Sequence, residues 1–487
     1  MSQEVRNLEP KALWNHFADI NAVPRASKKE EAIIQFMLDF GQKLGLDTQK
    51  DAVGNVLIKK PATPGMENRK TVVMQSHLDM VHQKNNDTIF DFATQGIEMW
   101  VDGDWVKAKG TTLGADNGLG VAAIMAVLAS TDIAHPAIEA LFTIDEETGM
   151  TGAKGLEGGW LQGEILLNLD TEEDDEIDIG CAGGIDVSGF RTYQEEETPE
   201  SSVGYQISVK GLQGGHSGMD IHKGLGNANK IMNRLLFDGF ENFGMQISTI
   251  QGGGLRNAIP RESVANIIIA SMYEDAFLLE MKELVEDIKT EFAVTEPQLQ
   301  IEITKINTPA KVLDLGVQEG LLRSLYTLPN GVYRMSATMQ DLVETSNNLA
   351  RVSVQDGTIE IHCLTRSSVE TSKYDLANAI RSALELIGCE VTFSGSYPGW
   401  TPNVDSPILK TLTKVYEDLF HTKPRVVACH AGLECGILGT NYPNMDMISF
   451  GPTIHGAHSP EERASISSSQ KFWKFLQQIL KEIPQKS

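Results

Sequence analysis

Residues 71–79 of the chain read TVVMQSHLD, an apolar run that ends directly at a histidine and an aspartate. A short continuous apolar run of this kind predicts a buried β-strand. The runs 138–145 (IEALFTID) and 165–169 (ILLNL) have the same character, and the small-residue segment 117–130 predicts a long helix between the first two strands. Because strands alternate with helices here, the sequence predicts an α/β fold with a mostly parallel sheet.

Side chains of metal-binding types follow these predicted strands or stand in loops. Because the carboxyl ends of parallel strands meet at one edge of a sheet, such side chains can converge there from distant parts of the sequence. Two histidines with several carboxylates suit a pair of divalent metal ions, zinc above all. The group consists of His77 and Asp79 in SHLDMV, Asp116 in GADNG, Glu146 and Glu147 in IDEETG, Asp170 in NLD, and His458 in GAHSPEE.

Each of these positions also has a purely structural explanation. His77 and Asp79 are two residues apart on a strand and point to the same face, so they could form an ordinary hydrogen bond. The acids at 146–147 could be solvated residues that open a helix. Asp116 could cap the helix that follows it, and His458 could lie in a loop whose next residue caps another helix. Their combination favours a metal site, because no structural need places ligand types at all of these separate positions.

Length and composition describe a large globular protein. The 487 residues exceed the size at which a single hydrophobic core stops growing, so two domains are expected. Of the residues 41% are hydrophobic and 22% charged, and no apolar run has the length of a membrane span. The formal net charge of −25 would repel nucleic-acid phosphates and anionic lipids, so neither nucleic acid nor a membrane is an expected partner.

Two features of the sequence predict a cytoplasmic location. The N-terminal segment lacks the basic start and the apolar stretch of a secretory signal. The five cysteines follow no paired spacing and leave an odd one over, which agrees with a reducing compartment.

The character of the sequence changes after Gly184. An acidic stretch, 191–202 (RTYQEEETPESS), precedes an alternating strand and indicates the start of a second domain. The last histidine of the metal group lies near the C-terminus, so the C-terminal residues must complete the first domain. We therefore expect a discontinuous first domain at 1–184 and 400–487, and an inserted domain at 185–399 that could act as a lid.

The inserted segment predicts an α+β domain of doubled ferredoxin-like type. Its first half has the order β-α-β-β-α-β, and a similar partial order follows without any sequence repeat. The first half comprises strands near 203–211, 245–250, 263–270 and 298–305 and helices near 225–237 and 274–293. The second half comprises helices near 314–326 and 371–387, a hairpin around Asp356-Gly357 and a strand near 390–394.

Seven motifs together resemble one enzyme family, the co-catalytic zinc hydrolases that include glutamate carboxypeptidases, aminoacylases and dipeptidases. They are SHLDMV, GADNGLG, DEETG, LNLD, GGHSG, RNAIP and GAHSPEE, in the family's order and over essentially the whole chain. The longer strings ADNGLGVAAIMAVL and HAGLECGIL are similar to bacterial dipeptidases that cleave aminoacyl-histidine substrates. The resemblance implies a zinc-exopeptidase-like catalytic domain and the hydrolysis of dipeptides, preferentially Xaa-His dipeptides including β-alanyl-histidine.

The resemblance also implies two zinc ions per subunit, for which cobalt or manganese could substitute. Asp116 would bridge the two ions. Glu147 and His458 would complete the site of one ion, and His77 and Asp170 the site of the other. Aspartate at the last of these acidic positions is typical of the family's aminopeptidases and dipeptidases.

Three residues are expected to serve catalysis. The resemblance implies that Asp79 holds the ring of His77 in place, as groups behind metal ligands generally do. Glu146, next to Glu147, would be the general base that moves a proton from the attacking water to the leaving amine. His216 in QGGHSG could be part of an ordinary turn, but the resemblance implies that it stabilises the oxyanion, and its flanking glycines allow close approach.

Three further residues are candidates for substrate binding. Asn257 in GLRNAIP and Arg366 in CLTRSS resemble positions that hold the substrate backbone and its free carboxylate, or else they belong to ordinary lid structure. Glu434 in HAGLECG could bind the free amino group of a substrate, or it could cap a local turn.

Other functions remain open on the same residues. An N-acyl amino acid deacylase or a tripeptide exopeptidase would need the same metals and base with a different pocket. An inactive metal-binding scaffold is the alternative from another class, against which the presence of Glu146 argues. The doubled inserted domain leaves monomer and homodimer equally possible.

Overall fold

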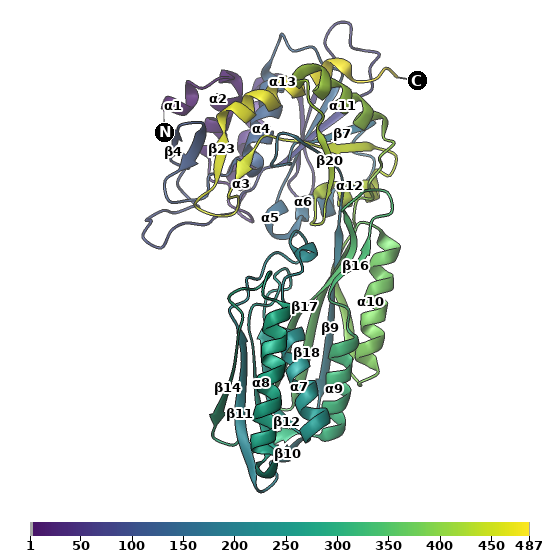
Figure 1. The fold of residues 1–487 in the computed structure, drawn as a ribbon. Coiled ribbons are helices and arrows are strands. Elements are labelled where there is room, and N and C mark those ends of the chain that lie inside the picture. The colour runs from purple at the N-terminus through teal and green to yellow at the C-terminus, as the bar shows by residue number, and fades with distance from the viewer. Residues whose placement is uncertain (1–2, 487) are drawn as a thin grey trace. The chain divides into compact units, whose positions relative to one another are not determined.

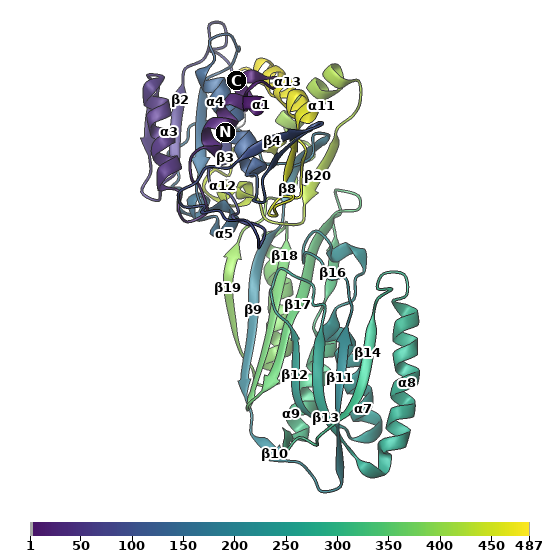
Figure 2. The same cartoon turned by 90° about the vertical axis from the view of Figure 1, so that its left-hand side faces the viewer.

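The computed structural model describes residues 3–486. Within this range the chain forms two compact units (Figures 1 and 2). Unit 1 comprises the residues up to Gly180, Trp400–Ala428 and those from Leu433 on. Unit 2 comprises Cys181–Gly399 and Cys429–Gly432. The inserted unit thus includes a short second segment, which the sequence did not reveal.

Unit 1 takes its elements from both ends of the chain. Its strands are β1 (Asp47–Lys50), β2 (Val56–Lys60), β3 (Val72–His77), β4 (Met99–Asp102), β5 (Trp105–Ala108), β6 (Ile138–Thr143), β7 (Ile165–Asn168), β8 (Glu176–Cys181), β20 (Arg425–Cys429), β21 (Asp446–Ser449), β22 (Ile454–His455) and β23 (Arg463–Ser465). Its helices are α1 (Gln3–Arg6), α2 (Lys11–Asn21), α3 (Glu31–Lys43), α4 (Ala115–Ala129), α5 (Glu146–Gly149), α6 (Thr151–Gly155), α11 (Pro407–Phe420), α12 (Glu434–Asn441) and α13 (Ile466–Glu482).

The main sheet of unit 1 has the strand order β1-β2-β6-β3-β7-β21-β8-β20. Its central strands β6, β3, β7 and β21 run parallel, whereas β1, β2 and β8 pair antiparallel on either side. Every residue of β3, β6 and β7 is buried, which explains why these strands appear in the sequence as continuous runs. The predicted α/β class with a parallel sheet is therefore confirmed.

Helix α4 packs directly against β3. Gly120 makes this approach possible, because a Cβ atom at this position would come within 2.5 Å of Ser76 Oγ and 2.6 Å of Leu169 O. The residues from Leu119 to Leu128 are all buried, as expected for a helix that is apolar on every side. The start of α4 is thereby fixed next to the carboxyl ends of β3 and β7.

A second, smaller sheet of unit 1 has the order β22-β23-β5-β4. Its strands contain only two to four residues each. Strands this short carry no recognisable period in sequence, so the sheet was not predicted.

Unit 2 is an α+β structure. Its strands are β9 (Gly183–Thr192), β10 (Glu195–Glu197), β11 (Ser202–Lys210), β12 (Gln246–Gly253), β13 (Ser263–Ala270), β14 (Gln300–Ile306), β15 (Lys311–Leu313), β16 (Gly331–Met335), β17 (Val343–Gln355), β18 (Thr358–Ser367) and β19 (Glu390–Tyr397). Its α-helices are α7 (Ala228–Phe243), α8 (Glu274–Glu291), α9 (Leu315–Thr327) and α10 (Glu370–Glu385), with short 3-10 helices at Ile221–Lys223 and Ser271–Tyr273.

The large sheet of unit 2 has nine strands in the order β14-β11-β13-β12-β17-β18-β9-β19, with β16 beside β17, and all its pairs are antiparallel. Helices α7 to α10 cover one face of it (Figures 1 and 2). The buried cluster between helices and sheet contains side chains of both halves, among them Phe277 and Leu384. The two halves therefore share one core.

The predicted element order of unit 2 is confirmed. Its first half runs β11-α7-β12-β13-α8-β14, and its second half contains the predicted hairpin of β17 and β18. Asp356 and Gly357 form the turn of that hairpin with φ values of 49° and 72°, the left-handed conformation that a two-residue hairpin turn requires. The acidic stretch 191–202 lies inside unit 2, where part of it forms β10.

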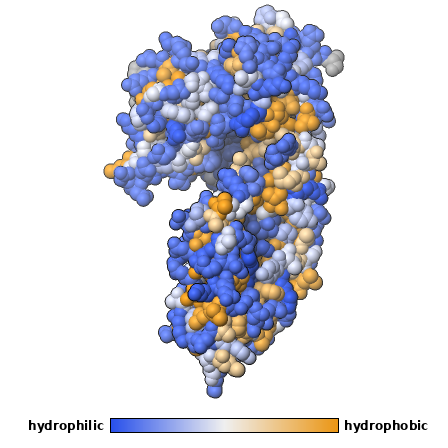
Figure 3. Space-filling view, in the orientation of Figure 1, coloured by the Kyte–Doolittle hydropathy of each residue, from blue (hydrophilic) through white to orange (hydrophobic). Residues whose placement is uncertain are grey.

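The surface agrees with the acidic composition. Figure 3 shows a mostly hydrophilic face with small apolar groups scattered over it. None of the helices among residues 3–486 combines the length and the apolar character that crossing a membrane requires.

The shared core of unit 2 gives a first prediction. Phe277 on α8 is fully buried and makes edge-on ring contacts with Phe243, so Phe277→Ala should lower the free energy of unfolding of this unit by about 3–5 kcal/mol. Leu279 on the same helix is 62% exposed, and Leu279→Ala should stay within about 0.5 kcal/mol of the wild type. Urea denaturation of both variants measures the difference, and equal losses would contradict the contribution of the buried Phe277 to this core.

Candidate metal centre

The predicted ligands of the metal group all lie in unit 1 and converge. His77 ends β3, Glu147 lies in α5 directly after β6, and Asp170 follows β7. Asp116 lies at the start of α4, and His458 comes from the loop between β22 and β23. Their donor atoms form two groups within 4.8 Å: His77, Asp116 and Asp170 in one, and Asp116, Glu147 and His458 in the other.

Asp116 belongs to both groups because its two carboxylate oxygens face different histidines. Its Oδ1 lies 3.1 Å from His77 Nε2, and its Oδ2 lies 3.2 Å from His458 Nε2. Each histidine nitrogen also faces a second carboxylate. His77 Nε2 lies 3.5 Å from Asp170 Oδ1, and His458 Nε2 lies 3.0 Å from Glu147 Oε2.

The electrostatics of these contacts favour positive charge at two points. Burial would lower the pKa of His77, but the carboxylates of Asp170, Asp116 and Asp79 hold it well above its usual value. Hydrogen bonds to Asp116 and Glu147 raise the pKa of His458 to about 11. Burial would raise the pKa of Asp116, yet its contacts with His458 and His77 lower it. Burial raises the pKa of Asp170 to about 6.

The residues present fit a pair of divalent metal ions. His77 Nδ1 faces the backbone oxygen of Asp79 at 3.1 Å and its Oδ1 at 3.3 Å, so in the neutral ring, the form that binds a metal, Nδ1 carries the proton and Nε2 has the lone pair. That lone pair points toward Asp116 and Asp170, so Nε2 is placed to bind a cation together with these two carboxylates. Glu147 Oε1 is buried without a hydrogen-bond partner among the described residues. The nitrogen and oxygen donors are those that zinc binds.

Asp79 supports the group from behind. Besides facing His77, its carboxylate accepts hydrogen bonds from Ser27 Oγ at 2.8 Å, from Glu146 N at 3.0 Å and from Glu147 N at 3.3 Å. It therefore fixes both the histidine ring and the first turn of α5. That Asp79 supports the metal ligand His77 in catalysis stays a prediction.

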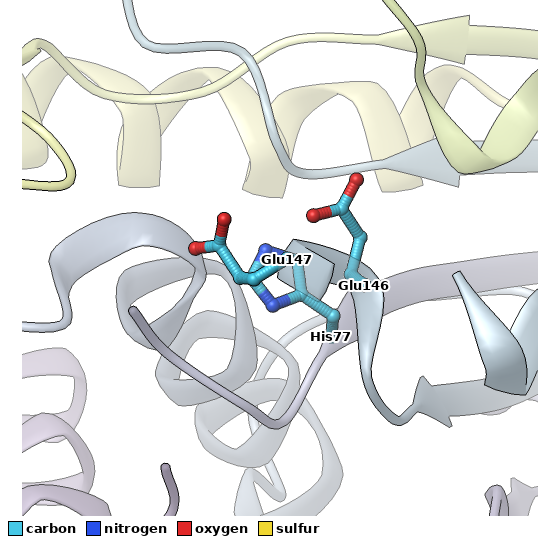
Figure 4. A group of neighbouring side chains, drawn as sticks. All are labelled: His77, Glu146 and Glu147. Carbon is cyan, nitrogen blue, oxygen red and sulfur yellow. The ribbon is translucent and has the colours of Figure 1, made fainter. Parts of the chain in front are cut away.

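Glu146 and Glu147 extend from adjacent positions of α5. Figure 4 shows their carboxylates on either side of the His77 ring, and the donor atoms of all three lie within 4.8 Å of one another. Burial raises the pKa of Glu146 well above its usual value. Glu146 is thus a proton acceptor next to the metal group. It belongs neither to the donor group of His77, Asp116 and Asp170 nor to that of Asp116, Glu147 and His458.

The capping hydrogen bond considered for Asp116 is not seen. Among the described residues, the hydrogen bonds of its carboxylate are with His77 and His458, and none comes from a backbone N–H at the start of α4. The φ and ψ angles of Asp116 (−79° and 112°) and of Asn117 (−102° and 30°) are not helical, so the regular turns of α4 begin after Asn117. The carboxylate of Asp116 is therefore directed to the histidines and does not stabilise the helix end.

Two residues that the sequence did not single out hold the segment before Asp116. Glu462 Oε2 accepts hydrogen bonds from Leu113 N at 2.7 Å and Gly114 N at 2.9 Å. Its Oε1 accepts from the next two amides along the chain, at 2.7 Å and 3.3 Å. From the other side, the buried Arg25 donates to the carbonyl oxygens of Gly114, Leu78 and Asp79.

Glu462 comes four residues after His458, so one loop supplies a ligand and also holds the segment of another. GAHSPEE was recognised as a motif for its histidine, and its last glutamate carried no separate signal. Arg25 stands in the polar segment PRASKKE, where nothing distinguishes it from a surface residue.

Glu434 lies in unit 1 and is completely buried at the start of α12. Its Oε2 accepts hydrogen bonds from Gln75 Nε2 and Thr143 Oγ1, both at 2.6 Å. Its Oε1 is buried with no hydrogen-bond partner among the described residues. Burial raises its pKa to about 7. The local-turn cap considered for Glu434 is not seen, because no side-chain hydrogen bond caps α12.

The remaining predicted residues, His216, Asn257 and Arg366, lie together in unit 2. His216 Nδ1 accepts hydrogen bonds from Gly218 N at 3.2 Å and from Met219 N at 3.0 Å, which leaves the ring proton on Nε2. Ser217 connects the three residues, because its N donates to Asn257 O at 2.8 Å and its Oγ accepts from Arg366 Nε at 3.4 Å.

The fold and this metal-binding group define a class of protein. The chain belongs to peptidase family M20/M25/M40, whose family model matches residues 73–482. Membership of this family implies a metal-dependent peptidase, and the family predicted from the motifs is confirmed.

Two relatives resemble the chain over its whole length. It is 44% identical over 483 residues to the cytosol non-specific dipeptidase of Escherichia coli (strain K12), covering 99% of this chain and 100% of the relative. The crystal structure of the aminoacylhistidine dipeptidase from Vibrio alginolyticus has a TM-score of 0.94 and 44% identity, covering 100% of this chain and 99% of the other.

A more distant structure shares the fold. An aminopeptidase from Bacillus cereus ATCC 10987 has a TM-score of 0.58 at 15% identity, covering 98% of this chain and 99% of the other.

The contacts of Glu462 lead to a second prediction. Glu462→Gln replaces one accepting oxygen by an amide group that cannot accept from backbone N–H, so the segment before Asp116 should shift and zinc affinity should fall by about 10–100-fold. Competition with a chromogenic chelator measures this affinity. The neighbouring Glu461 is exposed, and Glu461→Gln is the matched control that should bind zinc like the wild type. Equal affinities in both variants would refute the role of Glu462.

Proposed function

We propose that this protein is a dipeptidase that uses two zinc ions, which cobalt or manganese can replace. The observation that carries the proposal is the position of Asp116, whose two oxygens face His77 and His458, with the carboxylate of Glu146 close by. The relatives that match the whole chain are named as dipeptidases, which supports the substrate class. The name of the first relative also supports a cytosolic location.

Each ion would be held by one of the two groups of donor atoms. His77 and Asp170 would hold one ion and Glu147 and His458 the other, with Asp116 shared between them. When bound, the two ions supply Lewis acidity for the peptide carbonyl and for the attacking water.

Glu146 would move the proton of the reaction. A carboxylate with a raised pKa can take a proton from the attacking water and then hand it to the nitrogen of the leaving amine. Its place in α5, fixed by the hydrogen bond from its own N–H to Asp79, keeps it next to the metal group without making it a ligand.

Unit 2 would contribute the groups that hold the substrate. With Nδ1 accepting from the backbone, His216 has an Nε2–H that can donate to a developing oxyanion. Arg366 is nearly buried and could pair with the free carboxylate of a dipeptide, while Asn257 would bind the substrate backbone. We propose that the inserted unit, near residues 185–399, acts as a substrate-binding lid.

The proposed preference is for Xaa-His dipeptides, including β-alanyl-histidine. The name of the structurally similar Vibrio enzyme supports this preference, whereas the name of the Escherichia coli relative indicates broader use of dipeptides. The preference is therefore best tested on a panel that contains histidyl and other dipeptides together with N-acyl amino acids and tripeptides.

A third prediction tests the general base. Glu146→Gln keeps the shape of the side chain but cannot accept a proton, so kcat for β-alanyl-histidine should fall at least about 100-fold. The control is Glu157→Gln, which changes an exposed glutamate of the same unit and should keep full activity. Chelation should abolish the activity of the wild type, and two equivalents of zinc should restore it.

The outcomes separate the parts of the proposal. An active Glu146→Gln variant would refute the proton transfer. A wild type that binds two zinc ions but cleaves only N-acyl amino acids or tripeptides would keep the metal centre and refute the dipeptidase. A wild type that binds zinc and cleaves nothing on the panel would favour a metal-binding scaffold.

A fourth prediction concerns the substrate's free amino group. Glu434 has one oxygen without a partner among the described residues, so we propose that it accepts a hydrogen bond from the ammonium group. A hydrogen bond to a charged group contributes about 1.5–3 kcal/mol, so Glu434→Gln should raise KM about 10–100-fold for free dipeptides. KM for N-acetylated dipeptides, measured in the same assay, should not rise in this variant. An equal rise of KM for both substrates would contradict the assignment.

A further inference from the structure

A row of buried polar side chains crosses the main sheet of unit 1 near the carboxyl ends of its strands. Neighbouring strands contribute Gln75 from β3, Asn168 from β7, Ser449 from β21 and Asp178 from β8. The strand register places Gln75 beside Asn168, Asn168 beside Ser449, and Ser449 beside Asp178. Polar groups at this depth must satisfy one another, so their hydrogen bonds can be traced completely.

The hydrogen bonds form one chain that ends in a carboxyl group on each side. At one end Glu434 Oε2 accepts from Gln75 Nε2 at 2.6 Å, and Gln75 Oε1 accepts from Asn168 Nδ2 at 2.6 Å. Asn168 Oδ1 accepts from Ser449 Oγ. Thr171 Oγ1 continues the chain, 2.8 Å from Ser449 Oγ.

The other end of the chain is Asp178. Its Oδ2 lies 2.8 Å from Thr171 Oγ1. The two carboxyl groups, Glu434 and Asp178, are thus joined through two amides and two hydroxyls, and each hydroxyl has only one hydrogen to donate.

With the two amides in this orientation, counting the hydrogens places a proton on Asp178. Ser449 gives its hydrogen to Asn168, so the hydrogen between Ser449 and Thr171 must come from Thr171. Thr171 then has none left for Asp178, and the short contact between them requires that Asp178 itself donates. Asp178 is a protonated carboxylic acid in this arrangement, while Glu434 only accepts and is ionised.

If the side-chain amides of Gln75 and Asn168 are rotated by 180°, every hydrogen bond in the row reverses its direction. Ser449 would then donate to Thr171, Thr171 to an ionised Asp178, and Glu434 would need a proton to donate to Gln75. The chain therefore requires a proton at one end or the other. The first arrangement also satisfies Thr143, whose hydroxyl donates to Glu434 and accepts from Gln75 Nε2.

We infer that Asp178 is a positioning residue, which as a neutral acid orients the amides of Asn168 and Gln75 so that Glu434 stays negatively charged for a substrate ammonium group. This inference rests on the proposed function for the role of Glu434, but the proton on Asp178 is a property of the protein without substrate.

The surroundings of both ends agree with a shared proton. Burial raises the pKa of Asp178 to about 7, with downward contributions from the hydrogen bond with Thr171 and from Arg425 and upward ones from Glu176 and Asp170. Burial raises the pKa of Glu434 to about 7 as well, while His77 and Thr143 act in the opposite direction. With pKa values near 7, neither Asp178 nor Glu434 has to be ionised at neutral pH.

Infrared spectroscopy of the zinc-loaded enzyme near pH 7 tests the proton directly. A protonated carboxylic acid has a carbonyl stretch well separated from that of carboxylates. The difference spectrum of wild type minus Asp178→Asn should contain this band, whereas Asp132→Asn, at an exposed position, should give none. Glu434→Gln should keep the band, which tests the assignment even if Asp178→Asn fails to fold.

Kinetics provide the second readout. The side-chain amide of Asp178→Asn donates to Thr171 as the acid does, so KM for free dipeptides should stay within about 2-fold of the wild type. Thr171→Val interrupts the chain, and it should raise KM for free dipeptides more than for N-acetylated ones.

Two results would overturn the inference. One is a difference spectrum of wild type minus Asp178→Asn that lacks the band, or the loss of that band in Glu434→Gln. The other is a large rise of KM in Asp178→Asn. If the band behaves as expected but Glu434→Gln leaves KM unchanged, the proton on Asp178 stands and the proposed role of Glu434 in substrate binding fails.

Discussion

The contact of Asp116 with two histidines is the constraint on which the rest of unit 1 depends. One carboxylate can face His77 and His458 only if the end of β3, the start of α4 and a loop near the C-terminus meet within a few ångströms. Gly120 lets α4 approach β3, Arg25 and Glu462 hold the segment before Asp116, and the parallel strands bring the other acids to the same edge. The architecture is arranged around one shared side chain.

The edge of this sheet concentrates buried acids, and each is compensated in its own way. Asp79 and Glu462 accept several backbone N–H groups, which satisfy a carboxylate without a cation. Asp116 faces two histidines. Asp178 is placed to keep its proton. Because a buried unpaired charge is costly, these different solutions allow many acids in a small volume and leave Glu146 and Glu434 available for chemistry.

Much of this arrangement could be predicted from the sequence. The strands that carry His77 and Asp170 are buried on both faces and therefore appear as apolar runs, and the order of elements in unit 2 follows its alternating patterns and the turn at Asp356-Gly357. The roles of Arg25 and Glu462 could not be predicted, because these residues bind backbone groups of distant segments and such contacts leave no local sequence pattern. The row of polar side chains from Gln75 to Asp178 could not be predicted either, because these residues become neighbours only when their strands pair in the sheet.

The strand order has a consequence for biosynthesis. Strand β21 lies between β7 and β8 in the main sheet, yet it is encoded after the whole of unit 2. A nascent chain therefore exposes β7 and β8 with a gap between them until Ser449 has left the ribosome. At about 5–20 residues per second this wait lasts on the order of tens of seconds. The inserted unit can fold during that time, whereas the main sheet of unit 1 stays incomplete until β21 is added.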